Sequence, residues 1–118
     1  MGTAEVLRGF FKCGASAALV IADDGMILGE EYKGNDFSST GIAEAVAKAL
    51  AVASEAYEGF GKGLMERQQV HFGKYQLHIE TLGGKRNLVL VLGAKANIGR
   101  IRLEIRKSKP VLEKEIQI

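Results

Sequence analysis

The sequence predicts an α+β protein with an antiparallel sheet, in the order helix, two strands, helix, three strands, helix. The alanine-rich stretch 40–58 contains no proline and is long enough for a continuous helix. The stretches 17–22 and 88–92 are apolar at every position, as expected of strands covered on both faces. Residues 67–72 and 75–82 instead alternate between apolar and polar side chains, which predicts strands with one wet face.

Length and composition limit the class of protein. With 118 residues, 47% hydrophobic and 25% charged, we expect residues 1–118 to form a single globular domain. The only cysteine is Cys13, so no intramolecular disulfide is possible. No targeting segment and no apolar stretch of about 20 residues is found. These features predict a cytoplasmic setting.

The N-terminal part predicts a short helix and a hairpin. Residues 3–12 begin with a threonine cap, carry apolar side chains at helical spacing and are followed by Gly14. The apolar stretches 17–22 and 26–31 flank the sequence Asp-Asp-Gly, a strong signal for a hairpin turn. The turn accounts for the two adjacent acids, so we assign them no catalytic role.

The central helix 40–58 has two apolar arcs when its residues are placed about 100° apart around the axis. The bulky arc, which we expect on the sheet, contains Ile42, Val46, Leu50, Ala53 and Tyr57. The second arc has mostly small side chains and contains Gly41, Ala45, Ala49, Val52 and Ala56. One small sheet cannot cover both arcs, so we predict that the second arc packs on its own copy in a two-fold dimer. The alternative is an alanine-rich helix whose water-exposed face happens to be apolar.

The second half predicts three strands. The stretches 17–22 and 88–92 should be central neighbours beneath helices on both faces, because both are apolar throughout. The alternating stretches 67–72 and 75–82 should reach outward and be partly open.

The last segment, 97–107, fits a helix or a strand by its isoleucine spacing. We favour a helix, since Asn97 is a plausible cap and basic residues crowd the last turns, where they interact favourably with the helix dipole. Pro110 is expected to follow the end of this helix.

The inventory of reactive residues is sparse. The glycine-rich runs 59–63 and 83–85 lack the spacing of a phosphate-binding loop and are interpreted as turns. His71 and His78 should face glutamines across the strand pair rather than each other, and we expect both at the surface. Cys13 is expected to be a small core residue. The sequence therefore predicts no catalytic residues, no cofactor and no metal site.

Charge is unevenly distributed along the chain, although the net charge is only +2. The acidic residues of the first half are Asp23, Asp24, Glu30, Glu31, Asp36, Glu44, Glu55 and Glu58. The basic residues near the end are Lys95, Arg100, Arg102, Arg106, Lys107 and Lys109. Such a separation could steer a charged protein partner. Nucleic acid is not favoured, because no aromatic residue lies in the basic segment to stack on a base.

Three stretches carry a resemblance to a known family: ALVIADDGMILGEE (18–31), the alanine-rich helix 42–57, and LVLVLGAKANIGRIRLEIRKSKPVLEKEI (88–116). In order and spacing they resemble the Roadblock family, the dynein light chains and their prokaryotic relatives that regulate small Ras-like GTPases. The resemblance covers nearly the whole chain. It implies a five-stranded antiparallel, Roadblock/profilin-like sheet, with the long helix on one face and the terminal helices on the other.

The resemblance also implies a dimer, homo- or heterodimeric, in which the long helices pair and the third strands meet edge to edge. We predict a homodimer whose interface residues are Ala45, Ala49, Val52, Ala56, Gln69, Val70 and His71. The implied partner is a Ras-like small GTPase, whose GTP hydrolysis some relatives stimulate by reordering the GTPase's own residues. The expected contact residues are Glu44, Lys48 and Glu55. A non-catalytic structural adaptor of a motor or membrane-associated complex is the alternative, and a small-ligand sensor domain is the third hypothesis.

Overall fold

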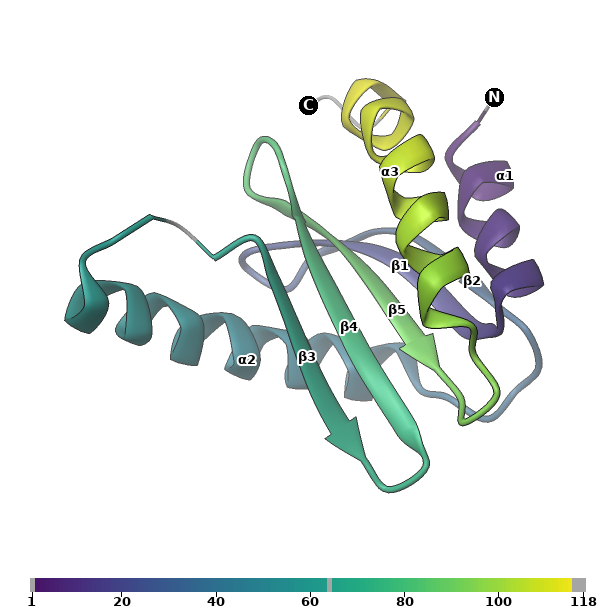
Figure 1. The fold of residues 1–118 in the computed structure, drawn as a ribbon, viewed down its shortest axis with the longest axis horizontal. Coiled ribbons are helices and arrows are strands. Elements are labelled where there is room, and N and C mark those ends of the chain that lie inside the picture. The colour runs from purple at the N-terminus through teal and green to yellow at the C-terminus, as the bar shows by residue number, and fades with distance from the viewer. Residues whose placement is uncertain (1, 64, 116–118) are drawn as a thin grey trace.

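The computed structural model describes residues 2–63 and 65–115. Figure 1 shows the helices and strands in the predicted order. They are α1 (Thr3–Arg8), a 3-10 helix η1 (Gly9–Cys13), β1 (Ala15–Ala22), β2 (Ile27–Tyr32), α2 (Ser39–Phe60), β3 (Arg67–Phe72), β4 (Tyr75–Leu82), β5 (Arg86–Leu92) and α3 (Ile98–Glu115). The predicted α+β class and the bounds of β3 and β4 are thereby confirmed.

The five strands form one antiparallel sheet in the order β2-β1-β5-β4-β3. β1 and β5 pair in the middle of the sheet, as predicted from their continuous apolar stretches. Helix α2 covers one face of the sheet and α1 and α3 cover the other (Figure 1). This three-layer arrangement confirms the expected placement of the long and the terminal helices.

Alternation along β1 builds two separate cores. Leu19 and Ile21 lie in the cluster beneath α2, together with Ile42 and Val46 of that helix. Val20, between them in sequence, belongs to the cluster beneath α1 and α3. Successive side chains of a strand point to opposite faces, so an all-apolar strand must be covered on both.

The predicted end of the last helix is wrong. We expected the helix to stop before Pro110, but α3 continues to Glu115 with this proline inside it. Pro110 is exposed, whereas Leu112, two residues later on the opposite, sheet-facing side of the helix, is fully buried. We attribute the continuation to the apolar surface that Leu112 buries, which offsets the backbone hydrogen bond that proline cannot donate.

The N-terminal helix also differs from its prediction. The α-helical part ends at Arg8, and the chain continues as the 3-10 helix η1 up to Cys13. Gly14 then reverses the chain with a φ angle of 99°, in the left-handed region. A Cβ atom at this position would lie 2.6 Å from the Cα atom of Ala96, so the turn requires glycine.

Helix α2 is capped at both ends. The Ser38 hydroxyl accepts a hydrogen bond from the Gly41 backbone N–H at 3.2 Å, and the helix ends at Gly61 in the left-handed conformation. Its bulky arc was predicted to lie wholly on the sheet, which is wrong for the C-terminal half. Val46 is fully buried, but Tyr57 is 43% exposed, because α2 extends beyond the edge of the sheet (Figure 1).

Candidate functional site

An apolar furrow runs along the α2 face of the molecule between α2 and β3. Among the residues that the structure describes, β3 is the last strand of the sheet, so one of its edges has no neighbouring strand there. Large hydrophobic side chains are exposed on both elements: Val52 by 61%, Phe60 by 73% and Phe72 by 55%. A row of exposed apolar side chains beside an open strand edge is typical of an interaction surface.

Three hollows join to form this furrow. The middle one, of about 440 Å³, is lined by residues that include Ala49, Val52 and Phe72. Towards the C-terminal end of α2 it shares Val52 with a hollow of about 410 Å³ that Phe60 also lines. At the other end it shares Phe72 with a hollow of about 330 Å³ that reaches Tyr75. The furrow is therefore shallow and apolar, and it follows α2 from Gly41 to Phe60.

The structure divides the residues predicted at the dimer interface between two faces of the sheet. Five of them line the furrow: Ala45, Ala49, Val52, Ala56 and Val70. Gln69 and His71 alternate with Val70 along β3, so their side chains point to the opposite face, the one that carries α1 and α3. These two residues can join an edge-to-edge contact through their backbone, but their side chains lie outside the furrow.

Two of the residues predicted to contact a partner lie at the furrow. Glu44 and Lys48 both line its middle hollow from α2. Glu55 is exposed further along the same helix. The furrow thus has an apolar floor with charged side chains on its helical rim.

Sequence reasoning missed several residues of the furrow. Phe72 alternates with Val70 along β3, and that spacing could have placed it there. Phe60 and Met65 lie outside the stretches we assigned to helix and strand, so no periodicity pointed to them. At the other end Phe37 packs edge to face on Tyr75, with ring centroids 5.2 Å apart. No local pattern indicates that contact between a loop and a strand.

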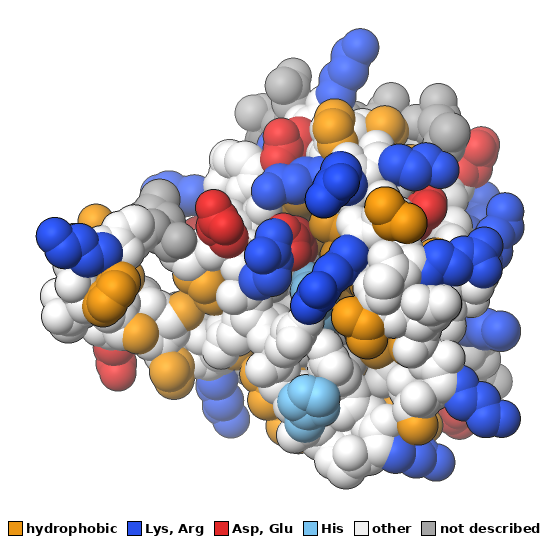
Figure 2. Space-filling view, in the orientation of Figure 1, with side chains coloured by type: hydrophobic (Ala, Val, Ile, Leu, Met, Phe, Trp, Pro, Cys, Tyr) orange, Lys and Arg blue, Asp and Glu red, His pale blue; other side chains and the backbone are white. Residues whose placement is uncertain are grey.

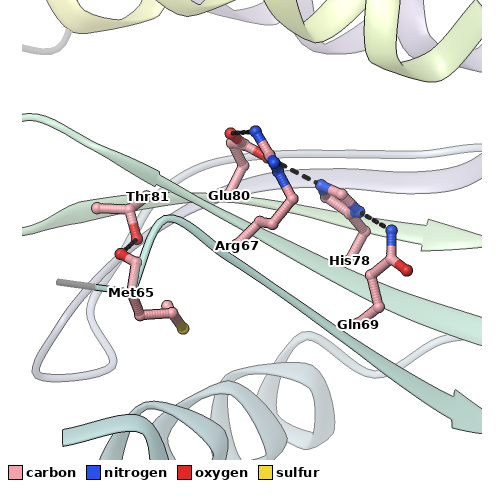
Figure 3. A network of polar contacts seen from close by, with 6 residues as sticks. All are labelled: Met65, Arg67, Gln69, His78, Glu80 and Thr81. Atoms are coloured by element: carbon pink, nitrogen blue, oxygen red, sulfur yellow. Dashed lines mark hydrogen bonds and ion pairs between the residues drawn. The ribbon is translucent and has the colours of Figure 1, made fainter. Parts of the chain in front are cut away.

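A polar network fastens the edge strand β3 to β4 on the opposite face (Figure 3). The Glu80 carboxylate accepts hydrogen bonds from Arg67 Nε at 3.3 Å and from His78 Nε2 at 3.1 Å. The Gln69 side-chain amide donates to His78 Nδ1 at 3.3 Å, which leaves the proton of a neutral imidazole on Nε2. At the start of β3 the Thr81 hydroxyl donates to the Met65 carbonyl at 3.0 Å.

The expected surface position of His78 is wrong, because this side chain is only 2% exposed. Its neighbour on the same face, Glu80, is 4% exposed. Burial of two polar side chains is tolerated here because each has hydrogen-bond partners within the network. The register does confirm that His78 faces Gln69 and that His71 faces Gln76.

The pKa of Glu80 is lowered in the folded protein. Burial by itself would raise this pKa, but hydrogen bonds from His78 and Arg67 to the carboxylate outweigh it. A lowered pKa means that folding favours the ionised form. The contribution to stability is therefore complete above the unfolded pKa of about 4.3 and is lost as pH falls through the lower folded pKa.

We predict that the free energy of unfolding decreases on acidification below about pH 4.3 and that Glu80→Gln shows a smaller decrease over the same range. Urea titrations at successive pH values measure both curves. Glu66→Gln is the matched control, since Glu66 is exposed and directly precedes β3. This variant should lose stability on acidification as the wild type does. Equal acid sensitivity of the wild type and Glu80→Gln would contradict the assignment.

The reactive side chains lie apart from the furrow. Cys13 is buried, as predicted, and burial raises the pKa of its thiol, which keeps it protonated. Within residues 2–63 and 65–115, no group of three or more His, Cys, Asp or Glu side chains is placed to hold a metal ion. In the same part of the chain, no helix has both the length and the apolar content needed to cross a bilayer.

No protein-family model matches the sequence, and no curated protein does so either. Solved structures do match the fold. Myxococcus xanthus MglB superposes with a TM-score of 0.82 at 20% identity, over 93% of this chain and 90% of that one. An MglB structure with a tetrameric arrangement gives a TM-score of 0.83 at 21% identity, over 94% and 85%. A Roadblock/LC7 domain from Streptomyces avermitilis gives 0.72 at 18% identity, over 95% and 98%. These likenesses establish a Roadblock-type fold.

Proposed function

We propose that this Roadblock-type domain is a cytoplasmic homodimer that binds a Ras-like small GTPase and regulates it. The observation that carries the proposal is the apolar furrow between α2 and the open edge of β3. Val52 and Phe60 are exposed there, and pairing with a second copy would remove their apolar surface from water.

A two-fold pairing suits the geometry of this region. In a two-fold interface the same patch on each subunit meets itself, so two α2 helices would cross at their small side chains. Two β3 edges would at the same time hydrogen-bond into one continuous sheet. The tetrameric arrangement of an MglB structure with this fold supports self-association as a property to test here.

Regulation is favoured over catalysis by the chemistry of the furrow. Its lining is mostly apolar, and the charged side chains Glu44 and Lys48 lie at its rim. Such a surface offers an apolar floor to a second copy and a charged rim to a further partner, but neither a nucleophile nor a general base in a closed cleft. A regulator would act by holding the GTPase's own residues in their reactive positions, with Glu44, Lys48 and Glu55 as the proposed contacts.

The test is single-turnover GTP hydrolysis by a Ras-like GTPase of the same organism, with and without the protein, together with the mass of any complex. We expect a complex and faster hydrolysis. A complex with unchanged hydrolysis would favour the structural adaptor instead. The absence of a complex would overturn the proposed partner.

A pair of variants locates the contact. Glu44→Lys combined with Glu55→Lys reverses two charges on α2 and should weaken the complex. Arg102→Gln combined with Arg106→Gln also changes two exposed charges, but on α3, across the sheet, and should leave the complex intact. Equal losses from both pairs would contradict a contact through α2.

A further inference from the structure

Helix α3 presents a basic outer surface with an apolar centre. Its buried stripe contains Ile101, Ile105 and Leu112. With about 100° between successive residues, Leu103 and Pro110 lie opposite that stripe. Leu103 is 59% exposed and Pro110 is also exposed.

Basic side chains flank this centre on both sides. The row Arg100, Lys107 and Lys114 repeats every seven residues, so its members lie along one side of the helix. Arg102 and Arg106 lie along the other side, and all five basic side chains are exposed.

Two acidic side chains of this helix, Glu104 and Glu113, have partners beside the basic surface, and Glu104 Oε2 lies 4.0 Å from Lys107 Nζ. Glu104 reaches the N-terminal helices, where its Oε1 lies 3.3 Å from the position of a Cβ on Gly9. Glu113 Oε1 accepts a hydrogen bond from the Gly83 backbone N–H at 3.4 Å, in the turn between β4 and β5. Lys107 is thus partly balanced by Glu104, whereas Arg100, Arg102, Arg106 and Lys114 keep the outer surface of α3 positively charged.

Figure 2 shows Lys and Arg side chains spread across the face that carries α1 and α3. The acidic α2 residues Glu44 and Glu55 belong to the layer on the other side of the sheet. The hollows described above also lie on that other side. A helix that forms the outermost layer is convex, which suits a broad, flat, negatively charged partner rather than a peptide that needs a groove.

We propose that the outer surface of α3 docks the protein on an anionic lipid bilayer. Arginine and lysine on both sides of the helix contact the lipid phosphates, and Leu103 enters the headgroup region between them. A bilayer is favoured over nucleic acid because the apolar centre of the patch has a partner in lipid and none in a phosphate backbone.

A single chain carries this whole surface, so docking on a bilayer does not require the proposed dimer. If two chains pair through α2 and β3 in one continuous sheet, both α3 helices lie on the same side of it. The two basic surfaces would then face one plane and strengthen the attachment. The furrow of each chain would remain on the side away from the lipid.

The first test is co-sedimentation with vesicles of phosphatidylcholine, with or without phosphatidylserine. We expect binding only to the vesicles that contain phosphatidylserine, and its loss near 1 M salt, where the screening length is about 3 Å. Arg102→Gln combined with Arg106→Gln should lower the partition coefficient about 25-fold, or about fivefold for each charge. Lys33→Gln combined with Lys74→Gln is the control with the same net charge, at two exposed positions away from α3 and from the lining of the furrow, and should bind like the wild type.

The second test places a fluorescent reporter on α3. The chain has no tryptophan, so Leu103→Trp introduces a single one at an exposed position. Its emission should shift to the blue when phosphatidylserine vesicles are added, because the indole leaves water. Met26→Trp, at a position 60% exposed beside the acidic hairpin turn, is the control and should not shift.

Three results would overturn the proposal. One is equal binding to vesicles with and without phosphatidylserine. Another is an equal loss of binding from the α3 pair and the control pair, since net charge alone would then explain it. The last is a protein that does not bind the vesicles but does bind a short DNA duplex, with a loss of DNA binding in the variant that lacks Arg102 and Arg106.

Discussion

Replacing Val52 by arginine is expected to convert the dimer to monomers while leaving the fold intact. Val52 is 61% exposed in the single chain, so the longer side chain has room there. In the proposed dimer the same position lies where the two α2 helices cross, and the guanidinium would be buried there without a partner. A buried unpaired charge costs about 3 kcal/mol or more, which corresponds to at least about 100-fold weaker dimerisation.

Sedimentation equilibrium at micromolar concentration measures this effect. Leu103→Arg is the matched control, because it introduces the same side chain at a similarly exposed apolar position on α3, across the sheet. The control should remain dimeric. If Val52→Arg dimerises with unchanged affinity, the dimer interface does not lie along α2.

Replacing Leu112 by alanine is expected to destabilise the fold by about 2–5 kcal/mol, the usual cost of emptying a leucine site in a core. Leu112 is fully buried in the cluster beneath α1 and α3. For a domain of this size a loss of about 3 kcal/mol lowers Tm by roughly 10 °C or more. Thermal unfolding followed by circular dichroism measures the shift.

The same substitution at Leu103 provides the comparison. This leucine lies on the same helix but is 59% exposed, so Leu103→Ala should change stability by no more than about 0.5 kcal/mol. If α3 ended before Pro110, Leu112→Ala would be as mild as Leu103→Ala. Similar Tm values for the two variants would therefore contradict the continuous helix.

The sequence predicted the order of the elements because each carries a strong local pattern. The two all-apolar stretches placed β1 and β5 together, and a two-residue turn at Gly73 and Lys74 set the register of β3 with β4. The last helix was predicted too short, because proline lacks the backbone N–H that an α-helix needs. That prediction did not include the apolar surface that Leu112 buries beyond Pro110.

The candidate site was predicted only in part for a related reason. Periodicity found the small-residue arc of α2, since that arc lies within one element. The furrow also needs Phe60 and Met65, which reach it from the end of a helix and from a loop. Their proximity arises from packing between segments and leaves no periodic trace along the chain.

For His78, the sequence pattern determined which face of the strand it occupies, and the tertiary structure determined whether it is buried. Its place on the polar face of β4, opposite Gln69, follows from a period of two residues and was predicted. Its burial depends on neighbouring elements that cover this face of the sheet. Inside that covered region Glu80 and Gln69 are its hydrogen-bond partners. The sequence by itself determined which face each residue of a strand or helix occupies, because that is fixed by local backbone geometry. Only the tertiary structure decided which faces are covered, because burial depends on segments that are distant along the chain.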